Sequence, residues 1–308
     1  MNEIDINRIQ EILSNQITFK GNKTFTFNGI QAAQEAEEGY MTWIKPGGKY
    51  EKELVNSVEA TGIICKESTL ELFEGDLKNK LFILTDKPKY VFVKLLKEIS
   101  ENEHGKFEGI HPTAIIDPKC ELGMNVSIGA FSIIGACKIG TNTKIYNNVR
   151  IYDPVTIGEN CIVREYCSIG GEGCGVQKEL NNENLHIPHI GYVKIEDNVQ
   201  IFPYCNIDRG NLGMTKVGYG SFLDHYVYVS HNSSIGKNNI IAGRTTFCGG
   251  SSVQDNCFLG VNTLIKEKVK LGSNILTGLG SVIIKDIPSD EVWAGNPAKF
   301  IKKTKNET

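Results

Sequence analysis

The chain has 308 residues, enough for two domains or for one domain and an extended array. Hydrophobic residues make up 40% of the chain and charged residues 22%, as in folded globular proteins, which excludes disorder throughout. A net charge of −3 argues against a nucleic-acid-binding protein, and no apolar run reaches the length of a transmembrane helix. The start, MNEIDINRIQ, lacks the pattern of a signal peptide, so we expect a cytoplasmic location.

Residues 1–105 predict a small α/β domain, because helical and strand patterns alternate along them. The polar stretch SENEHGKFEG indicates a linker at the end of this domain. In chain order we predict a helix at 4–13, strands at 22–30 and 40–45, a helix at 50–60, strands at 61–66 and 79–85, and a helix at 88–103.

From Ile110 onward, apolar residues recur at every sixth position, a period that fits neither a helix nor a simple alternating strand. Six is the period of hexapeptide β-helices, in which three hexads make one triangular coil of 18 residues. Residues 18 apart then stack at the strand spacing of about 4.8 Å. We therefore predict a parallel β-helix over residues 106–287. The longest unbroken series is Val217, Leu223, Val229, Ile235, Ile241, Phe247, Val253, Leu259, Ile265 and Leu271.

Two segments interrupt the period, and a third comes after it. Residues 170–194 are polar and glycine-rich and predict a loop ejected from the helix, which we expect to lean across a neighbouring subunit. Residues 209–216 are a shorter insertion. Residues 288–308 contain two prolines and a charged end, so we expect an irregular tail.

Nine cysteines are present, without a C-x-x-C pair. Five of them fall four residues after an aliphatic position of the repeat, in a slot that favours small side chains. We interpret these five as free thiols that fill the core: Cys120, Cys161, Cys167, Cys205 and Cys257.

The segments GGEGCGVQ, HIPHIGYVKI, NIDRG and LDHYVYVSHNSSIG occur in that order, and together they resemble the UDP-3-O-acylglucosamine N-acyltransferase family of lipid A (lipopolysaccharide) biosynthesis. The resemblance implies an α/β domain before a left-handed β-helix, and a homotrimer. It implies transfer of an acyl group from a phosphopantetheine thioester, on acyl carrier protein or CoA, to the amine of a nucleotide-linked amino sugar. No permanently bound cofactor is implied.

The same resemblance implies roles for individual residues. His231 matches the family's catalytic base, in a His-Asn pair with Asn232, and Gly249 matches a glycine whose N–H binds the thioester oxygen. Asp224 corresponds to an acidic residue that orients the histidine. Among substrate-binding positions, Asp208 and Arg209 match the Ile-Asp-Arg-Gly run, and Trp43 and Tyr50 stand nearest to two aromatic rings that stack uracil in the candidate nucleotide-binding domain.

The chain departs from the family pattern in several places. The asparagine between the two aromatics has no clear counterpart, a second family histidine aligns with Lys268, and Cys174 replaces a phenylalanine. We assign Lys268 to the acyl donor's phosphate. The chain also stops soon after GNPAKFIKK, as small-molecule acetyltransferases do. An acetyl-CoA-dependent N-acetyltransferase of a different nucleotide amino sugar, for surface polysaccharide, is therefore the alternative function.

Independently of family, His231 and Gly249 are 18 residues apart and so occupy the same corner of successive coils. A base and a bare backbone N–H there suit acyl transfer, because the reaction needs a proton acceptor and a donor to the oxyanion. His225 occupies the preceding corner. His186 and His189 form a pair in the ejected loop that is too small for a zinc site, so we expect no metal. A metalloenzyme and a non-enzymatic scaffold remain the other classes.

Overall fold

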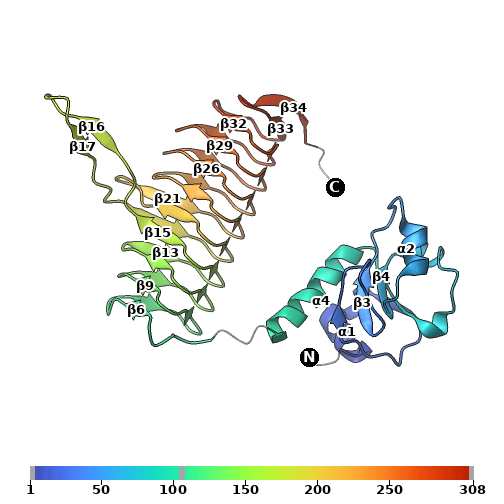
Figure 1. The fold of residues 1–308 in the computed structure, drawn as a ribbon. Coiled ribbons are helices and arrows are strands. Elements are labelled where there is room, and N and C mark those ends of the chain that lie inside the picture. The colour runs from blue at the N-terminus through green and yellow to red at the C-terminus, as the bar shows by residue number, and fades with distance from the viewer. Residues whose placement is uncertain (1–3, 104–107, 305–308) are drawn as a thin grey trace. The chain divides into compact units, whose positions relative to one another are not determined.

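The computed structural model describes residues 4–103 and 108–304 of the chain (Figure 1). The chain divides into two compact units, residues 1–106 and 107–308. Among the described residues, no helix has the length and apolar character needed to cross a membrane.

The first unit is a five-stranded sheet in the order β1-β5-β4-β3-β2 with helices on both faces. Its helices are α1 (Ile6–Leu13), α2 (Glu51–Ser57), α3 (Glu67–Leu70) and α4 (Pro88–Glu103), with 3-10 turns at Ser14–Gln16 and Leu77–Asn79. Its strands are β1 (Thr18–Gly21), β2 (Gly29–Ile30), β3 (Tyr40–Trp43), β4 (Gly62–Cys65) and β5 (Leu81–Leu84).

Alternation along β4 and β5 explains why this sheet has two covered faces. Successive side chains of a strand point to opposite faces. Ile64 and Ile83 pack with α1 and α4, whereas Ile63 and Phe82 pack with Val55 of α2. Every residue of both strands is buried, so their sequences are continuously apolar.

The predicted α/β character of this unit agrees with the described elements, but one predicted strand is much shorter in the structure and one strand was not predicted. Of the strand predicted at 22–30, only Gly29–Ile30 forms a strand, and Phe27 makes an isolated bridge to Ile4. The strand at Thr18–Gly21 was missed; it pairs antiparallel with β5 at the sheet edge. Because most of its side chains are exposed, it carries little of the apolar pattern that predictions use.

The second unit is a parallel β-helix of three sheets, each assembled from successive coils (Figure 1). Sheet 1 contains β7 (Glu121–Leu122), β10 (Lys138–Ile139), β13 (Val155–Ile157), β18 (Tyr192–Ile195), β21 (Met214–Val217), β24 (Ser234–Ile235), β27 (Ser252–Val253) and β30 (Lys270–Leu271). Sheet 2 contains β8 (Ser127–Ile128), β11 (Lys144–Ile145), β14 (Ile162–Val163), β19 (Gln200–Ile201), β22 (Phe222–Leu223), β25 (Ile240–Ile241), β28 (Phe258–Leu259), β31 (Leu276–Thr277), β33 (Glu291–Ala294) and β34 (Lys299–Lys303). Sheet 3 contains β6 (Ile115–Ile116), β9 (Ile133–Ile134), β12 (Arg150–Ile151), β15 (Ser168–Gly171), β20 (Asn206–Asp208), β23 (Tyr228–Val229), β26 (Thr246–Phe247), β29 (Leu264–Ile265) and β32 (Val282–Ile283).

The predicted register is confirmed. Val229 pairs with Phe247 and Phe247 with Ile265, each 18 residues on, and all three side chains are fully buried. In the two-residue strands, the second residue points inward and the first outward. The six-residue period is thus the spacing of the inward residues of one coil.

The five cysteines predicted to fill the core are reduced, and all but Cys120 are buried. The position four residues after the aliphatic one favours a hydrogen-bond donor as well as a small side chain. The side chain at this position donates a hydrogen bond to a carbonyl of the next coil. The Cys161 thiol donates to Glu196 O at 3.1 Å, as the Ser221 hydroxyl donates to Gly236 O at 2.9 Å. Small size and a weak donor explain why cysteine, serine and threonine share this slot.

Corners of the coils use the left-handed backbone region at residues other than glycine. Asn232 has a φ of 60° and Lys268 a φ of 60°, and Gly250 between them has a φ of 70°. Asparagine tolerates this region because its short amide bonds locally. The three form one column at the corner between sheets 3 and 1.

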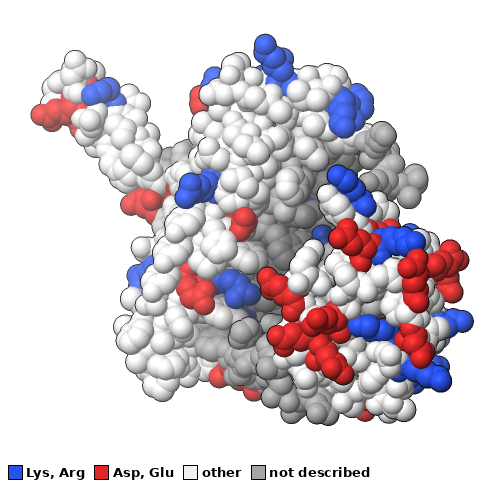
Figure 2. Space-filling view, turned by 45° about the vertical axis from the view of Figure 1, so that its right-hand side comes forward, with Lys and Arg blue, Asp and Glu red and all other residues white. Residues whose placement is uncertain are grey.

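The ejected segment contains an antiparallel hairpin, β16 (Val176–Lys178) and β17 (Asn184–His186), that projects from the coils (Figure 1). Basic and acidic side chains gather at its tip (Figure 2). The expected irregular tail is wrong for residues 291–303, because β33 pairs parallel with β31 and β34 folds back on β33. Trp293 is buried there and closes the end of the apolar core.

Candidate active site

His231 lies at the corner between β23 and β24, on a backbone that neighbouring coils hold firmly. The Asn232 N–H donates to Thr215 Oγ1 at 2.9 Å, and the buried Ser233 hydroxyl donates to Cys248 O at 3.1 Å. The imidazole Nδ1 lies 3.1 Å from Asn232 Oδ1. That amide oxygen also accepts the Asn211 N–H at 3.0 Å, which identifies it as the oxygen of the amide. Nδ1 of His231 therefore carries the hydrogen, and Nε2 has a free lone pair.

The free side of the His231 ring faces Gly249 on the next coil. A Cβ placed on Gly249 would lie 2.7 Å from both Cε1 and Nε2 of His231. Glycine is thus the only residue that leaves the ring in place. Among the described residues, no acceptor is paired with the Gly249 N–H. The His231 ring and Gly249 are thus neighbours on successive coils, as the spacing of 18 predicted.

Asp208, at the end of β20, is buried in the coil before His231. Its Oδ2 accepts the Tyr228 hydroxyl at 2.6 Å, and its Oδ1 accepts the Asn206 amide at 2.8 Å. Burial raises the pKa of Asp208, and the hydrogen bonds and the nearby His189 and His231 oppose that rise. Burial and the bond to Asp208 raise the pKa of Tyr228 to about 12. Asp208 is thus a buried side chain held by two hydrogen bonds within the protein.

His189 comes from the far end of the ejected segment and packs against His231. The two ring centroids are 4.9 Å apart and the rings meet edge to face at 73°. His189 Nδ1 lies 2.9 Å from Ile187 O, which fixes the hydrogen on Nδ1. Only 3% of His189 is exposed, and its Nε2 is buried with no hydrogen-bond partner.

The pair of histidines in the ejected segment has an acidic neighbour that the sequence did not reveal. Ligand atoms of Glu172, His186 and His189 lie within 4.8 Å of one another, a spacing compatible with a metal ion. These groups also bond within the protein. Glu172 Oε1 accepts the His189 N–H at 2.8 Å, and His186 Nε2 lies 3.2 Å from Gly173 O. The hydrogen bond from His189, together with nearby positive groups, lowers the pKa of Glu172.

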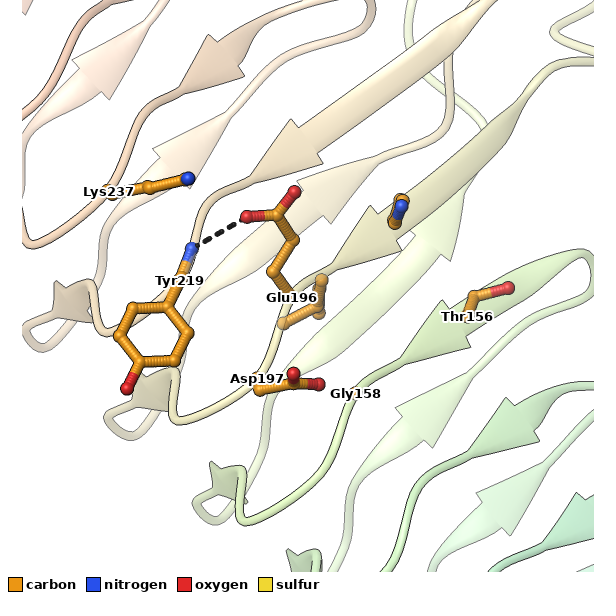
Figure 3. A pocket seen from close by; sticks show the side chains of 8 residues that line it. Thr156, Gly158, Glu196, Asp197, Tyr219 and Lys237 are labelled. Atoms are coloured by element: carbon orange, nitrogen blue, oxygen red, sulfur yellow. Dashed lines mark hydrogen bonds between the residues drawn. The ribbon is translucent and has the colours of Figure 1, made fainter.

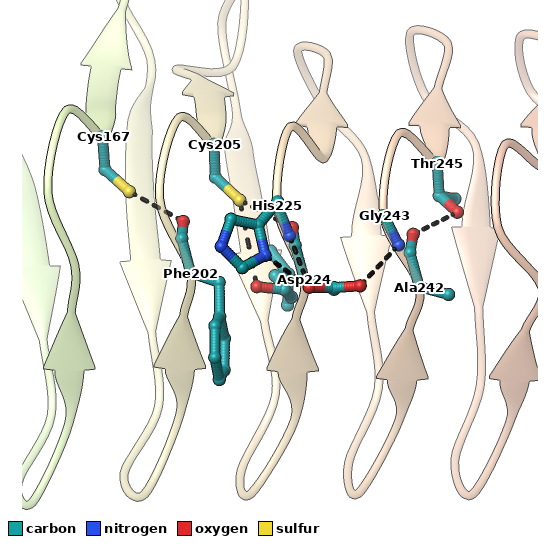
Figure 4. A network of polar contacts seen from close by, with 9 residues as sticks. Cys167, Phe202, Cys205, Asp224, His225, Ala242, Gly243 and Thr245 are labelled. Carbon is teal, nitrogen blue, oxygen red and sulfur yellow. Dashed lines mark hydrogen bonds and ion pairs between the residues drawn. The ribbon is translucent and has the colours of Figure 1, made fainter.

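Asp224 lies at a different corner, between β22 and β23, and does not bond to His231 in this structure. Its Oδ1 pairs with His225 Nδ1 at 2.8 Å and its Oδ2 accepts the Gly243 N–H at 3.0 Å (Figure 4). Burial would raise the pKa of Asp224, but these hydrogen bonds lower it overall. The neighbour that orients His231 is Asn232.

Two further residues from the sequence analysis lie near this corner with structural bonds of their own. Arg209 Nε donates to Gly170 O at 2.7 Å, and its N–H donates to Gly171 O at 2.9 Å, so it ties down the start of the ejected segment. Lys268 follows Gly250 in the corner column, and its N–H donates to Gly249 O at 3.0 Å. Its side chain is exposed.

The two candidate uracil-stacking residues have different surroundings within the first unit. The Trp43 ring packs 5.8 Å from Phe92 of α4 and belongs to the core on that face. Tyr50 precedes α2, is 62% exposed and lines a hollow with Glu53 and Leu54. Among the described rings, no pair joins Trp43 to Tyr50.

A separate hollow of about 460 Å³ lies on sheet 1 (Figure 3). Thr156, Tyr219 and Lys237 line it, and Glu196 accepts the Tyr219 N–H at 3.0 Å and pairs with Lys216 at 2.7 Å. The corner of His231 is not part of its lining.

Comparison with known proteins extends these observations. The family of bacterial transferase hexapeptide repeats (six repeats) matches residues 136–171. A UDP-3-O-acylglucosamine N-acyltransferase of Methylacidiphilum infernorum is 33% identical over 304 residues, which cover 92% of this chain and 84% of that protein. An enzyme of the same name from a Caulobacter species is 31% identical over 124 residues, 40% of this chain and 36% of the relative.

Solved structures share the coil architecture. A UDP-N-acetylglucosamine O-acyltransferase of Moraxella catarrhalis superposes with a TM-score of 0.59 at 26% identity, covering 64% of this chain and 75% of that one. A UDP-N-acetylglucosamine acyltransferase of Bacteroides fragilis gives 0.56 at 27% identity, covering 63% and 74%. With the sheets described above, these likenesses identify the second unit as the left-handed parallel β-helix.

Proposed function

The chain belongs to the family of UDP-3-O-acylglucosamine N-acyltransferases and is an acyltransferase, and on this premise we propose that the corner of His231 and Gly249 is its active centre. The substrate is the amine of a nucleotide-linked amino sugar, and the donor is an acyl phosphopantetheine thioester. The observation that carries the proposal is the His231 ring packed against Gly249, whose backbone N–H has no hydrogen-bond partner among the described residues.

In the proposed reaction, the neutral amine attacks the thioester carbonyl carbon and forms the C–N bond. His231 Nε2 takes the proton that the nitrogen loses, while the Gly249 N–H donates a hydrogen bond to the oxyanion. The C–S bond then breaks, and His231 returns the proton to the sulfur, which leaves as the pantetheine thiol. Asn232 keeps the hydrogen on Nδ1, so that Nε2 is the basic atom throughout.

Binding of the two substrates belongs to the same proposal. Lys268 is exposed one coil beyond Gly250, where it pairs with a phosphate of the donor. Exposed Tyr50 contributes a ring to the nucleotide base, since stacking on an aromatic ring is worth about 1–3 kcal/mol per base. Trp43 packs in the core with Phe92 and does not line that hollow, so in this proposal Tyr50 alone supplies the stacking ring.

A homotrimer in the cytoplasm completes the proposal, and sheet 2 supplies the surface for it. The outward residues of four consecutive strands, 18 apart, are Phe222, Ile240, Phe258 and Leu276, which are 39–50% exposed. The outward positions of sheet 1 are mostly polar, as at Lys194 and Lys216. A ladder of large apolar side chains on one sheet marks a protein interface.

Acyl transfer by the purified protein tests the function. It is incubated with 3-hydroxyacyl carrier protein or acetyl-CoA and with a panel of UDP-linked amino sugars that includes UDP-3-O-acylglucosamine. We expect turnover with the carrier protein, abolished by His231→Ala and retained by His225→Ala, whose side chain stands at another corner. Turnover with acetyl-CoA alone would replace the donor assignment with the alternative N-acetyltransferase, and His231→Ala with full activity would overturn the active centre.

A further inference from the structure

The ejected segment places His189, a histidine without an assigned role, in a buried cluster with Asp208 and His231. His189 has lost its solvent contact, and its Nε2 has gained no hydrogen-bond partner in exchange. A buried acceptor without a partner costs about 1–3 kcal/mol, so its retention needs a reason in the working protein. The bond from Nδ1–H to Ile187 O aims the negative end of the neutral ring away from that carbonyl and into the cluster.

The unpartnered nitrogen of His189 and the carboxylate of Asp208 both lie beside Gly173. A Cβ placed on Gly173 would lie 3.1 Å from His189 Nε2 and 3.1 Å from Asp208 Oδ2. The pairing of Ile207 with Val229 sets Asp208 beneath Ser230, the residue before His231. His231 closes the cluster with its ring against that of His189.

A buried lone pair and a buried carboxylate next to His231 favour a positive charge on its ring. His231 supplies that charge, because it becomes an imidazolium when it takes the proton of the amine. Its hydrogen-bond partner Asn232 is neutral and offers no charge to balance it. Other charged or titratable groups around the cluster are Glu172, Arg209, Tyr228 and His186. The first three bond to the His189 N–H, to Gly170 O and to Asp208, and the His186 ring stacks on His189 with centroids 6.2 Å apart.

We propose that Asp208 and His189 are positioning residues that together stabilise the imidazolium of His231, Asp208 through its charge and His189 through the lone pair of its neutral ring. The resting protein bears the cost of an unpaired acceptor, and the interaction is gained only when His231 is protonated in the reaction. Interactions of that kind lower the barrier, because they are stronger in the transition state than in the ground state. The catalytic meaning of this inference rests on the proposed acyl transfer.

Titration of the six histidines by NMR tests the inference without requiring turnover. The full-length protein is labelled with ¹³C-histidine, and His231→Ala assigns the signal of His231. We expect Asp208→Asn to lower the titration midpoint of His231 by about one unit, since a carboxylate near a histidine favours its charged form. Asp224→Asn is the matched control, because it removes the carboxylate of another corner, and it leaves the midpoint in place.

Variants of His189 separate the lone pair from the shape of the ring. His189→Phe keeps a ring and removes the nitrogen, whereas His189→Gln keeps a polar acceptor. We expect kcat to fall about tenfold or more in His189→Phe, with little change in KM, and to recover in His189→Gln. The same measurements after chelation of metal ions exclude a cation held by Glu172, His186 and His189 as the source of the effect.

The outcomes are distinct. An unchanged His231 midpoint in Asp208→Asn, or equal kcat in His189→Phe and wild type, overturns the inference. Absence of acyl transfer by the wild type overturns the proposed function instead, and the histidine titration then still decides whether Asp208 is the counter-charge of His231. A midpoint that changes only with added zinc assigns the cluster to a metal and overturns the inference as well.

Discussion

Replacing Gly249 by alanine tests the geometry of the active centre most directly. The new Cβ would lie 2.7 Å from Cε1 and Nε2 of His231, whereas ordinary contacts begin at about 3.4 Å. The ring must therefore retreat by about 0.7 Å from the position in which the proposed mechanism has its Nε2 accept the proton of the amine. A misplacement of about 1 Å at a reacting group costs about a hundredfold, so we expect kcat/KM to fall about 10- to 100-fold, or about 1.4–2.7 kcal/mol.

The fold itself should tolerate this substitution. Gly249 is not in the left-handed region of φ, so alanine meets no backbone strain there. Gly250 supplies the matched control, because its φ of 70° penalises alanine while its nearest neighbour is Lys268 Cγ at 3.6 Å. We expect Gly250→Ala to lower Tm and to keep kcat/KM near wild type. We expect Gly249→Ala to lower kcat/KM and to keep Tm near wild type.

Steady-state acyl transfer and differential scanning calorimetry on the two variants decide the matter. Gly249→Ala with wild-type kcat/KM would refute the reasoning that the imidazole needs the space above this glycine. Equal losses of activity in both variants would show that any change at this corner disturbs the site, and would refute the specific role of the His231 contact.

Three further predictions concern the rest of the chain. Iodoacetamide at pH 8 should label the exposed Cys174 and spare buried thiols such as Cys161, since burial raises the pKa of Cys161 to about 11; rapid labelling of Cys161 in mass spectra would contradict its burial. If the protein forms the proposed trimer, Phe258→Glu should dissociate it in sedimentation experiments, whereas Thr156→Glu on sheet 1 should not. A trimer that survives Phe258→Glu would exclude sheet 2 as the interface. Asp208→Asn should give a Tm at pH 7 equal to or higher than that of wild type. The raised pKa of Asp208 gives stability that is present below the ordinary pKa of an aspartate and is lost as pH rises. A Tm advantage of wild type over Asp208→Asn that grows with pH would contradict this pH dependence.

The repeat in the sequence determined the coil and part of the site. Each inward position, such as Val229 or Phe247, had to be apolar because three hexads close around one core, and a fixed period needs no knowledge of distant contacts. The same arithmetic placed Gly249 above His231, because residues 18 apart stack wherever the period is unbroken.

The tertiary structure decided the positions of residues outside the six-residue repeat and the directions of side chains at the corners. His189 lies in the ejected segment, where no repeat assigns a coil or a face, so its contact with His231 could not be read from spacing. The choice of carboxylate also depended on the fold. Asp224 is closer to His231 in sequence, but it points to His225 across its own corner, whereas Asp208 arrives from the previous coil and is buried beneath the site. Sequence separation measures neither the direction of a side chain nor its burial, and both decide which charge His231 experiences.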